Sequence, residues 1–320
     1  GAPMSWLELK VRGLREEAAD ILGIELCSPD ATPLPFAWTA GAHVDVQLGG
    51  GLVRQYSLTN LPDEGCLRLA IKHAEDSRGG SRWLHQQLRV GERLKVGAPR
   101  NLFPLQPGNA PVLLVAAGIG ITPLLAMYRQ CQVEQRPVSL LYFTRSPAHV
   151  AFVDELRDDP AVTLLSGMSA AQIAAQLRSL LPLWQAEQQL YTCGPDGFMQ
   201  CVQAIAGELG WPAAALHQEY FQPANEPAAN QATGLELVLA RSGKAVRVQA
   251  GESLVSAAAR VGVTIATSCG MGMCGACMTR VLDGEPEHRD QYLSDAERSS
   301  GEWLMPCVSS CSGARLALDC

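Results

Sequence analysis

Four cysteines near the C-terminus, Cys269, Cys274, Cys277 and Cys307, are spaced C-x4-C-x2-C-x29-C. This is the ligand spacing of plant-type [2Fe-2S] centres. The first three stand on one loop with three glycines among them, and glycine lets the backbone turn tightly around an inorganic core because it has no Cβ. Zinc also takes four thiolates, but it usually shows two separated C-x-x-C pairs. The spacing therefore predicts a [2Fe-2S] cluster and one-electron chemistry.

Two motifs in the N-terminal third could hold a flavin phosphate, RQYSL at 54–58 and RGGS at 78–81. The glycines of the second motif let backbone amides approach an anion at the start of a helix, and the arginine of each motif offers two donors. Tyr56 could lie against the flavin ring, and Ser57 could reach its redox-active edge. Each motif alone is also typical of an ordinary turn or strand surface. The candidate flavin-site residues are Arg54, Gln55, Tyr56, Ser57, Ile71, Lys72, Arg78, Gly79, Gly80 and Ser81.

Two further turns could hold a dinucleotide. VLLVAAGIGITP at 112–123 reads as a strand, a glycine turn and a helix start, with Pro123 where the dinucleotide fingerprint has its third glycine. A pyrophosphate can still bind at that helix N-terminus. YTCGPDGFM at 191–199 again follows a strand and opens a helix, and Cys193 could face a nicotinamide or belong to a structural turn. The candidates here are Gly118, Gly120, Thr122, Pro123, Cys193, Gly194 and Pro195.

The elements that position these motifs fall into three domains, so the chain is expected to be a multidomain β and α/β protein. Short strand-like runs over 4–108, interrupted by one helix near 81–88, predict an antiparallel β-barrel for the flavin. Alternating strands and helices over 109–222 predict a parallel α/β sheet for the nucleotide. A Pro-, Ala- and Asn-rich linker at 223–234 precedes an α+β ferredoxin domain of the β-grasp type at 235–320.

Composition excludes several classes of protein. A length of 320 residues and a mass of 34.2 kDa exceed what one core usually serves. The net charge of -7 argues against nucleic-acid binding and suits a basic docking partner or simple solubility. The apolar stretch at 111–127 is short and interrupted by glycine and proline, so no membrane span is expected. Residues 1–3 before Met4 resemble a tag-removal scar, no signal peptide is seen, and the expected location is the cytoplasm.

In this order the motifs resemble those of the phthalate dioxygenase reductase family, which includes the vanillate demethylase reductases. RQYSL and RGGS match its FMN site, GIGITP and CGPDGFM its pyridine-nucleotide site, and the cysteines with GEPEHRDQYLS at 284–294 its ferredoxin domain. The resemblance covers nearly the whole chain. It implies FMN rather than FAD, although the sequence alone leaves room for an adenosine half.

The resemblance also implies a relay in which NADH reduces FMN, FMN reduces the [2Fe-2S] cluster, and the cluster reduces a separate Rieske-type oxygenase. Thr144 and Arg145 follow a strand where the adenosine ribose should lie, and an arginine there leaves NADPH open. Phe221 matches an aromatic that approaches the flavin, or it closes a domain interface. Met271 and Met273 on the cysteine loop are expected to face the oxygenase.

Two rival functions remain. One is a stand-alone NAD(P)H-dependent flavin and iron-sulfur oxidoreductase that uses another soluble acceptor. The other is a nonenzymatic electron carrier or sensor with degenerate nucleotide domains, which the intact glycine turns at 118–123 and 193–199 argue against.

Overall fold

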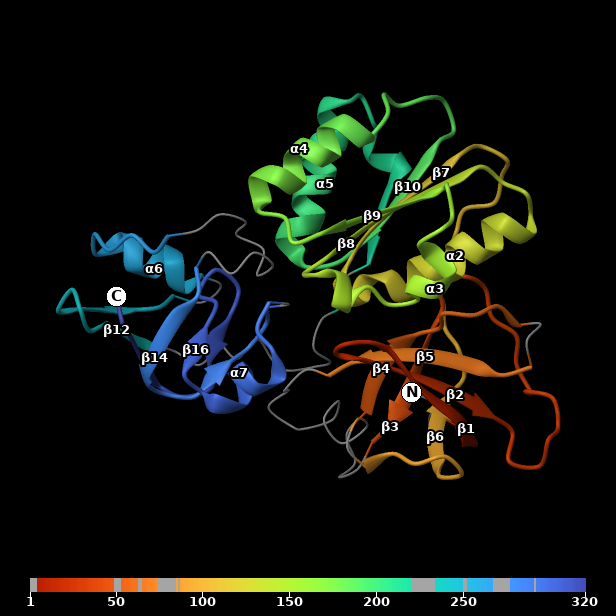
Figure 1. Cartoon of the computed structure of the whole chain (residues 1–320), viewed down its shortest axis with the longest axis horizontal. Coiled ribbons are helices and arrows are strands. Elements are labelled where there is room, and N and C mark those ends of the chain that lie inside the picture. The colour runs from red at the N-terminus through yellow and green to blue at the C-terminus, as the bar shows by residue number, and fades with distance from the viewer. Residues whose placement is uncertain are drawn as a thin grey trace. The chain divides into compact units, whose positions relative to one another are not determined.

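The structure of the chain is a computed structural model, and Figure 1 shows its course. The chain divides into two compact units. The larger contains one antiparallel and one parallel sheet, and the smaller contains the sheets of the C-terminal region. The domain boundaries expected from the sequence stay a prediction. The structure describes residues 5–48, 53–62, 65–73, 85, 87–219, 221, 234–249, 252–266, 277–290 and 292–320.

Six antiparallel strands form the N-terminal sheet, in the order β4-β3-β6-β1-β2-β5. Apolar and polar residues alternate along them; in β1, Leu9 and Val11 are buried and Lys10 between them is exposed. A backbone hydrogen bond joins the two edges of the sheet, from Thr59 N beyond β4 to Arg68 O of β5 at 3.0 Å. The expected antiparallel sheet is confirmed, and this bond closes it into a barrel at one end. Its strands are β1 (Trp6–Ala18), β2 (Ile21–Cys27), β3 (His43–Gln47), β4 (Val53–Ser57), β5 (Leu67–Lys72) and β6 (Arg93–Gly97).

Five parallel strands form the second sheet, in the order β11-β10-β7-β8-β9. Every residue of β7 is buried, as expected for a strand covered on both faces. Helices α2 and α5 lie on opposite faces (Figure 1), because right-handed crossovers lead from them in opposite directions along the sheet. The expected parallel α/β sheet is confirmed. Its elements are β7 (Val112–Ala117), η3 (Gly118–Gly120), α2 (Ile121–Val133), β8 (Val138–Thr144), η4 (Pro147–His149), α3 (Val153–Leu156), β9 (Val162–Ser166), α4 (Ala170–Leu180), β10 (Gln189–Cys193), α5 (Asp196–Glu208), η5 (Ala213–Ala215) and β11 (Leu216–Glu219).

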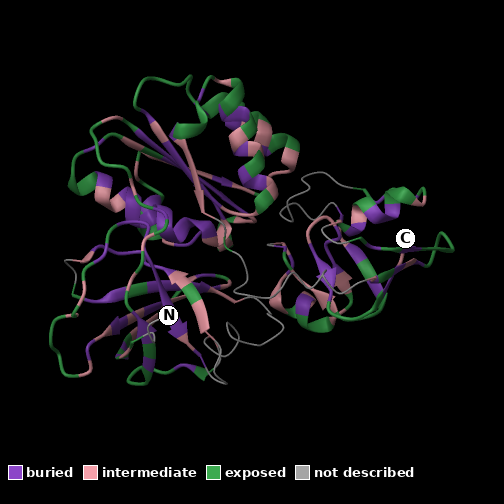
Figure 2. Cartoon of the chain, turned by 180° about the vertical axis from the view of Figure 1, so that it is seen from behind, coloured by how far each residue is buried: buried purple, intermediate pink, exposed green. Residues whose placement is uncertain are grey.

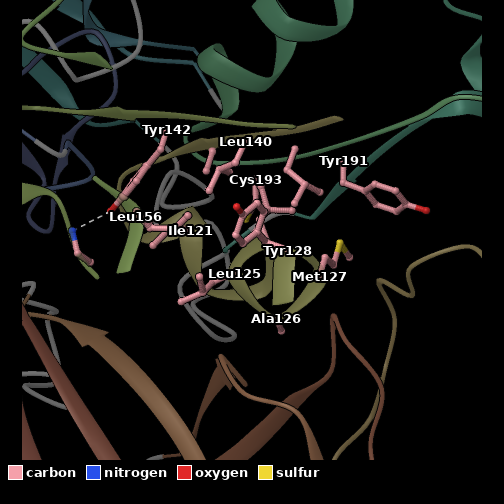
Figure 3. Packing of buried hydrophobic residues seen from close by; sticks show 14 of the residues in the cluster. Ile121, Leu125, Ala126, Met127, Tyr128, Leu140, Tyr142, Leu156, Tyr191 and Cys193 are labelled. Atoms are coloured by element: carbon pink, nitrogen blue, oxygen red, sulfur yellow. Dashed lines mark hydrogen bonds between the residues drawn. The ribbon is translucent and has the colours of Figure 1, made fainter. Parts of the chain in front are cut away.

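The barrel and the parallel sheet share one hydrophobic core. Ile21 and Phe103 from the barrel region belong to the same buried cluster as Leu125 and Tyr128 of α2. Figure 3 shows the α2 side chains of this cluster between the parallel strands above and the barrel strands below. Figure 2 colours the residues by burial and shows buried residues concentrated in the strands and in α2. The barrel and the parallel sheet are therefore packed as one body.

The smaller unit is an α+β fold built on a mixed sheet of order β13-β12-β18-β14-β16. Strands β12 and β18 run parallel, and the other pairs in this sheet are antiparallel. The expected hairpin is present as β12 and β13, and the expected helix as α6, which packs on its own apolar cluster. Its elements are β12 (Glu236–Leu239), β13 (Lys244–Arg247), α6 (Leu254–Arg260), β14 (Thr279–Asp283), β15 (Pro286–Glu287), α7 (Asp295–Ser300), β16 (Trp303–Leu304), β17 (Ser310–Cys311) and β18 (Arg315–Leu318).

Across the described ranges, no helix combines the length and the apolar character that crossing a membrane requires.

Candidate functional site

The two predicted nucleotide turns meet at one edge of the parallel sheet. The chain adds β8 and β9 on one side of β7, and β10 and β11 on the other, so the strand order reverses between β7 and β10. In open α/β sheets ligands bind outside the carboxyl ends of the strands at such a point. The turn of Gly118–Gly120 follows β7, and the turn at 193–195 follows β10. The structure thus brings both motifs to the expected place.

These two turns touch backbone to backbone at Gly120. A Cβ on Gly120 would lie 2.2 Å from the carbonyl oxygen of Cys193 and 2.4 Å from its carbonyl carbon. A Cβ on Gly194 would lie 2.9 Å from the Cβ of Ala117. Gly120 was predicted as a candidate nucleotide-binding residue, and the structure shows that the packing of the two turns already requires a glycine there. Helices α2 and α5 begin at this edge, where their first amides can bind an anion.

Two threonine side chains beside this edge make hydrogen bonds within the protein. Thr122 donates its hydroxyl to Ile119 O at 3.1 Å. Thr144, at the end of β8, is buried, and its hydroxyl lies 2.7 Å from Ser166 Oγ at the end of β9. Both hydroxyls thus hold the protein's own turns and strands. Arg145 is half-buried and next in the chain, and its contact with the adenosine ribose stays a prediction.

A carboxylate that the sequence analysis missed links the barrel to the parallel sheet. Ser57, at the end of β4, donates a hydrogen bond to Glu219 Oε1 at 3.3 Å. Glu219 ends β11 directly beside Cys193 of β10. Burial raises the pKa of Glu219 to about 7, although the hydrogen bond from Ser57 favours the carboxylate. Burial, together with the neighbouring Glu219, raises the pKa of the Cys193 thiol. The junction therefore holds a carboxyl group that can exchange a proton near neutral pH.

His43 adds an unsatisfied polar atom to the same junction. It lies directly opposite Ser57 in the β3–β4 ladder, and cross-strand neighbours share one face of a sheet. Its side chain is buried, and its Nε2 has no hydrogen-bond partner in the described part of the chain. A buried polar atom of this kind needs a partner. The junction therefore suits a ligand with a polar edge, as a flavin ring has.

The other described flavin candidates lie on the edge strands β4 and β5. Arg54 and Tyr56 share one face of β4, and Tyr56 packs partly against the barrel core. Ile71 of β5 is buried, and its carbonyl oxygen lies 2.8 Å from His85 Nε2, a contact that the sequence analysis did not expect. Gln55 is exposed and Lys72 is half-buried. Phe221 is 40% exposed. The remaining candidates lie outside the described residues: Arg78, Gly79, Gly80 and Ser81.

Two of the four predicted cluster ligands are described, Cys277 and Cys307, and their sulfur atoms are 3.2 Å apart. Two thiolates bound at about 2.3 Å to one tetrahedral metal would lie about 3.8 Å apart, so this pair is close enough to share one iron. The hydrogen bond with Cys307 lowers the pKa of Cys277 to about 7, against burial that raises it. A lower pKa favours the thiolate that metals bind. Cys269, Met271, Met273 and Cys274 lie outside the described residues.

Comparison with known proteins agrees with this arrangement. The 2Fe-2S iron-sulfur cluster binding domain family matches residues 237–312. The N-terminal domain family of the DmmA-like dimethylamine monooxygenase subunit matches residues 98–216. The first match includes both described cysteines of the cluster site, and the second spans the nucleotide edge.

Relatives match the chain along nearly their whole length. The chain is 38% identical over 319 residues to the vanillate O-demethylase oxidoreductase of Pseudomonas sp. strain HR199, covering 98% of this chain and 99% of that protein. It is 37% identical over 320 residues to the carnitine monooxygenase reductase subunit of Escherichia coli K12, covering 98% of each. The solved structure of phthalate dioxygenase reductase, described as modular for electron transfer from pyridine nucleotides to [2Fe-2S], matches with a TM-score of 0.65 at 35% identity, covering 99% of this chain and 98% of that one. The chain therefore belongs to the phthalate dioxygenase reductase-like family and is an iron-sulfur oxidoreductase.

Proposed function

We propose that the chain is the reductase component of an oxygenase system, and that it carries electrons from NADH through FMN and a [2Fe-2S] cluster to a Rieske-type oxygenase. The junction of Ser57, Glu219 and Cys193 carries this proposal, because it joins the flavin barrel to the switch point of the nucleotide sheet. Relatives that match along nearly their whole length are named a vanillate O-demethylase oxidoreductase and a carnitine monooxygenase reductase subunit. When bound, FMN and the cluster supply the conversion of a two-electron donor into single electrons.

The protein's own residues bind and orient the cofactors, and one of them holds a proton. The starts of α2 and α5 hold the nucleotide pyrophosphate, and the turn at 193–195 faces the nicotinamide. Arg54 and the RGGS motif hold the FMN phosphate. Oxidation of NADH by one-electron acceptors releases one proton. Glu219 Oε1 is placed to hold that proton through the Ser57 hydroxyl, because burial keeps its pKa near neutrality.

The choice of cofactor follows from family and position. The FMN assignment rests on the match of the RQYSL and RGGS motifs to the family, and the NADH assignment on the same match. Arg145 at the edge of β8 makes NADPH the alternative that kinetics must exclude. The proposed domain limits are 4–108 for FMN, 109–222 for NADH and 235–320 for the cluster, with a linker at 223–234.

Cofactor analysis of the purified protein tests the first half of the proposal. We expect FMN on chromatography of the extracted flavin, two irons and two sulfides per chain, and bleaching of both chromophores by NADH without oxygen. A matched titration with NADPH should require a higher concentration. Extraction of FAD, or equal use of NADPH, would contradict the corresponding cofactor assignment.

Reconstitution tests the partner. The reductase is mixed with the oxygenase component of a vanillate demethylase, NADH and vanillate, and the demethylated product is measured. Cytochrome c reduction in parallel reports an active reductase. Product formation that requires both components supports the proposal. Cytochrome c reduction with no product from any Rieske oxygenase offered would favour a stand-alone oxidoreductase with another soluble acceptor.

A further inference from the structure

A buried ionic cluster lies inside the C-terminal unit, next to the described cluster cysteines. The side chain of Asp290 is fully buried, that of Arg298 is 2% exposed, and that of His288 is 4% exposed. Arg298 Nη2 lies 3.5 Å from Asp290 Oδ2 and donates to the Asp290 carbonyl oxygen at 2.7 Å. His288 Nδ1 lies 3.8 Å from Asp290 Oδ1. A full charge pair this deep in a small domain is rare, because desolvation of each ion costs several kcal/mol.

Three connections tie this ionic cluster to the segments that carry the described cysteines. Strand β15 pairs with β17, which begins three residues after Cys307. Arg289, which directly precedes Asp290, donates its amide to Ser309 Oγ at 2.9 Å. The Asp290 carboxylate also accepts the amide of Leu293 at 2.7 Å, and Leu293 belongs to the same buried cluster as Cys277. The ionic cluster is thus tied to the segments that carry both described ligands.

The charges of this pair must act on an electron added to the cluster. Asp290 and Arg298 are buried, Asp290 is hydrogen-bonded to Leu293, and Leu293 packs in the same apolar core as Cys277. Reduction adds one negative charge, which a nearby carboxylate disfavours and a nearby guanidinium favours. Charges and hydrogen bonds around the sulfurs are among the main determinants of [2Fe-2S] potentials.

Stability alone gives a weak reason for this pair. Replacement of a buried ion pair by apolar residues of the same volume is often neutral or stabilising. Moreover, Asp290 Oδ1 and Arg298 Nε have no hydrogen-bond partner in the part of the chain that is described. A pair built only to hold the fold together would be expected to satisfy these atoms.

We propose that Asp290 and Arg298 form a buried charge pair that sets the reduction potential of the [2Fe-2S] cluster. The carboxylate makes reduction harder and the guanidinium makes it easier. Both charges act on the cluster through the protein interior, where charges are screened less than at the surface. The pair therefore fixes how readily the cluster accepts an electron.

The test is the midpoint potential of the cluster in the full-length holoprotein, measured by a redox titration followed by electron paramagnetic resonance. We expect Asp290→Asn to move the midpoint to a more positive potential, because Asn keeps the acceptor for the Leu293 amide and loses the charge. Arg298→Gln should move it to a more negative potential, and Arg298→Lys, which keeps the charge, should stay near the wild type. Midpoint shifts of opposite sign in Asp290→Asn and Arg298→Gln would identify an effect of charge, because a general loss of structure would not shift the two variants in opposite directions.

Asp283→Asn is the matched control, because this aspartate lies in the same unit with its side chain 66% exposed, and its removal should leave the midpoint nearly unchanged. Iron content and visible absorbance confirm that each variant retains its cluster. Shifts of Asp290→Asn and Arg298→Gln in the same direction, or no shift in either with full iron content, would overturn the proposal. If Asp290→Asn does not retain iron, the two arginine variants still decide, because equal midpoints for Gln and Lys at position 298 would also overturn it.

Discussion

Replacement of Gly120 by alanine should disrupt the packing of the two predicted nucleotide-binding turns through one steric contact. The backbone φ of Gly120 is −59°, which alanine adopts freely. The added Cβ would lie 2.2 Å from the carbonyl oxygen of Cys193, against 3.4–4 Å for ordinary contact. The obstacle is backbone and cannot rotate away, so the two turns must separate by about 1 Å. The substitution therefore tests the packing of the turns without changing the conformational preference of the chain.

The expected cost follows from this overlap. Overpacking of a buried site typically costs about 1–3 kcal/mol, and a rigid backbone partner places Gly120→Ala at the upper end. For a body of this size, about 3 kcal/mol corresponds to a fall in melting temperature of roughly 6–12 °C. Because the turn at 193–195 also moves, the KM for NADH in ferricyanide reduction should rise by about tenfold or more, since a misplacement of about 1 Å can cost a hundredfold.

Gly207→Ala is the matched control. Gly207 lies in α5, and a Cβ there would meet nothing within 4 Å. Alanine at an unstrained helical site stabilises by about 0.4–1 kcal/mol, so this variant should melt slightly above the wild type with an unchanged KM. A Gly120→Ala protein that melts with the wild type and keeps its KM for NADH would refute the reasoning.

Three further predictions concern other parts of the molecule. Cys307→Ser should lose the iron and the visible absorbance of the cluster while retaining flavin, whereas Cys311→Ser in the same unit should keep both, as iron analysis would show. Because burial holds the pKa of Glu219 near 7, above the ordinary value of 4.5, the folded chain keeps this proton between those pH values. Stability should then decline by up to about 3 kcal/mol as pH rises through that window, and Glu219→Gln should abolish this decline in melting curves taken at pH 5 and 7.5. Tyr128→Phe removes a hydroxyl bonded to Asp159 and should lower the free energy of unfolding by about 1–3 kcal/mol, measured by urea denaturation with unchanged cofactor content.

Local patterns in the sequence predicted most of the architecture. The unbroken apolar run of β7 and the glycine turn after it are local signals, and the run correctly indicated a buried parallel strand, while the nucleotide site at the turn stays a prediction. The hairpin of β12 and β13 was equally readable from alternation. The 2Fe-2S domain was predicted from cysteine spacing and is confirmed by the family match.

Residues defined by distant pairing were not predictable in this way. Glu219 matters because β11 lies beside β10 and because the barrel brings Ser57 to it, and neither relation leaves a periodic signal. His43 faces Ser57 only through the register of β3 and β4. The Asp290 and Arg298 pair is separated by eight residues and by the turn before α7. Two charged residues in a polar stretch ordinarily indicate a solvated surface, and only packing reveals their burial.

The core that the barrel shares with the parallel sheet has a consequence for the exchange of modules between reductases. Because Ile21, Phe103 and α2 belong to one buried cluster, a chimera joined near residue 108 would place unmatched side chains on both sides of that core. The C-terminal unit has an apolar cluster of its own. Recombination within this family should therefore succeed at the predicted linker at 223–234. The barrel and the parallel sheet would then be exchanged together, and the C-terminal iron-sulfur unit would be exchanged separately.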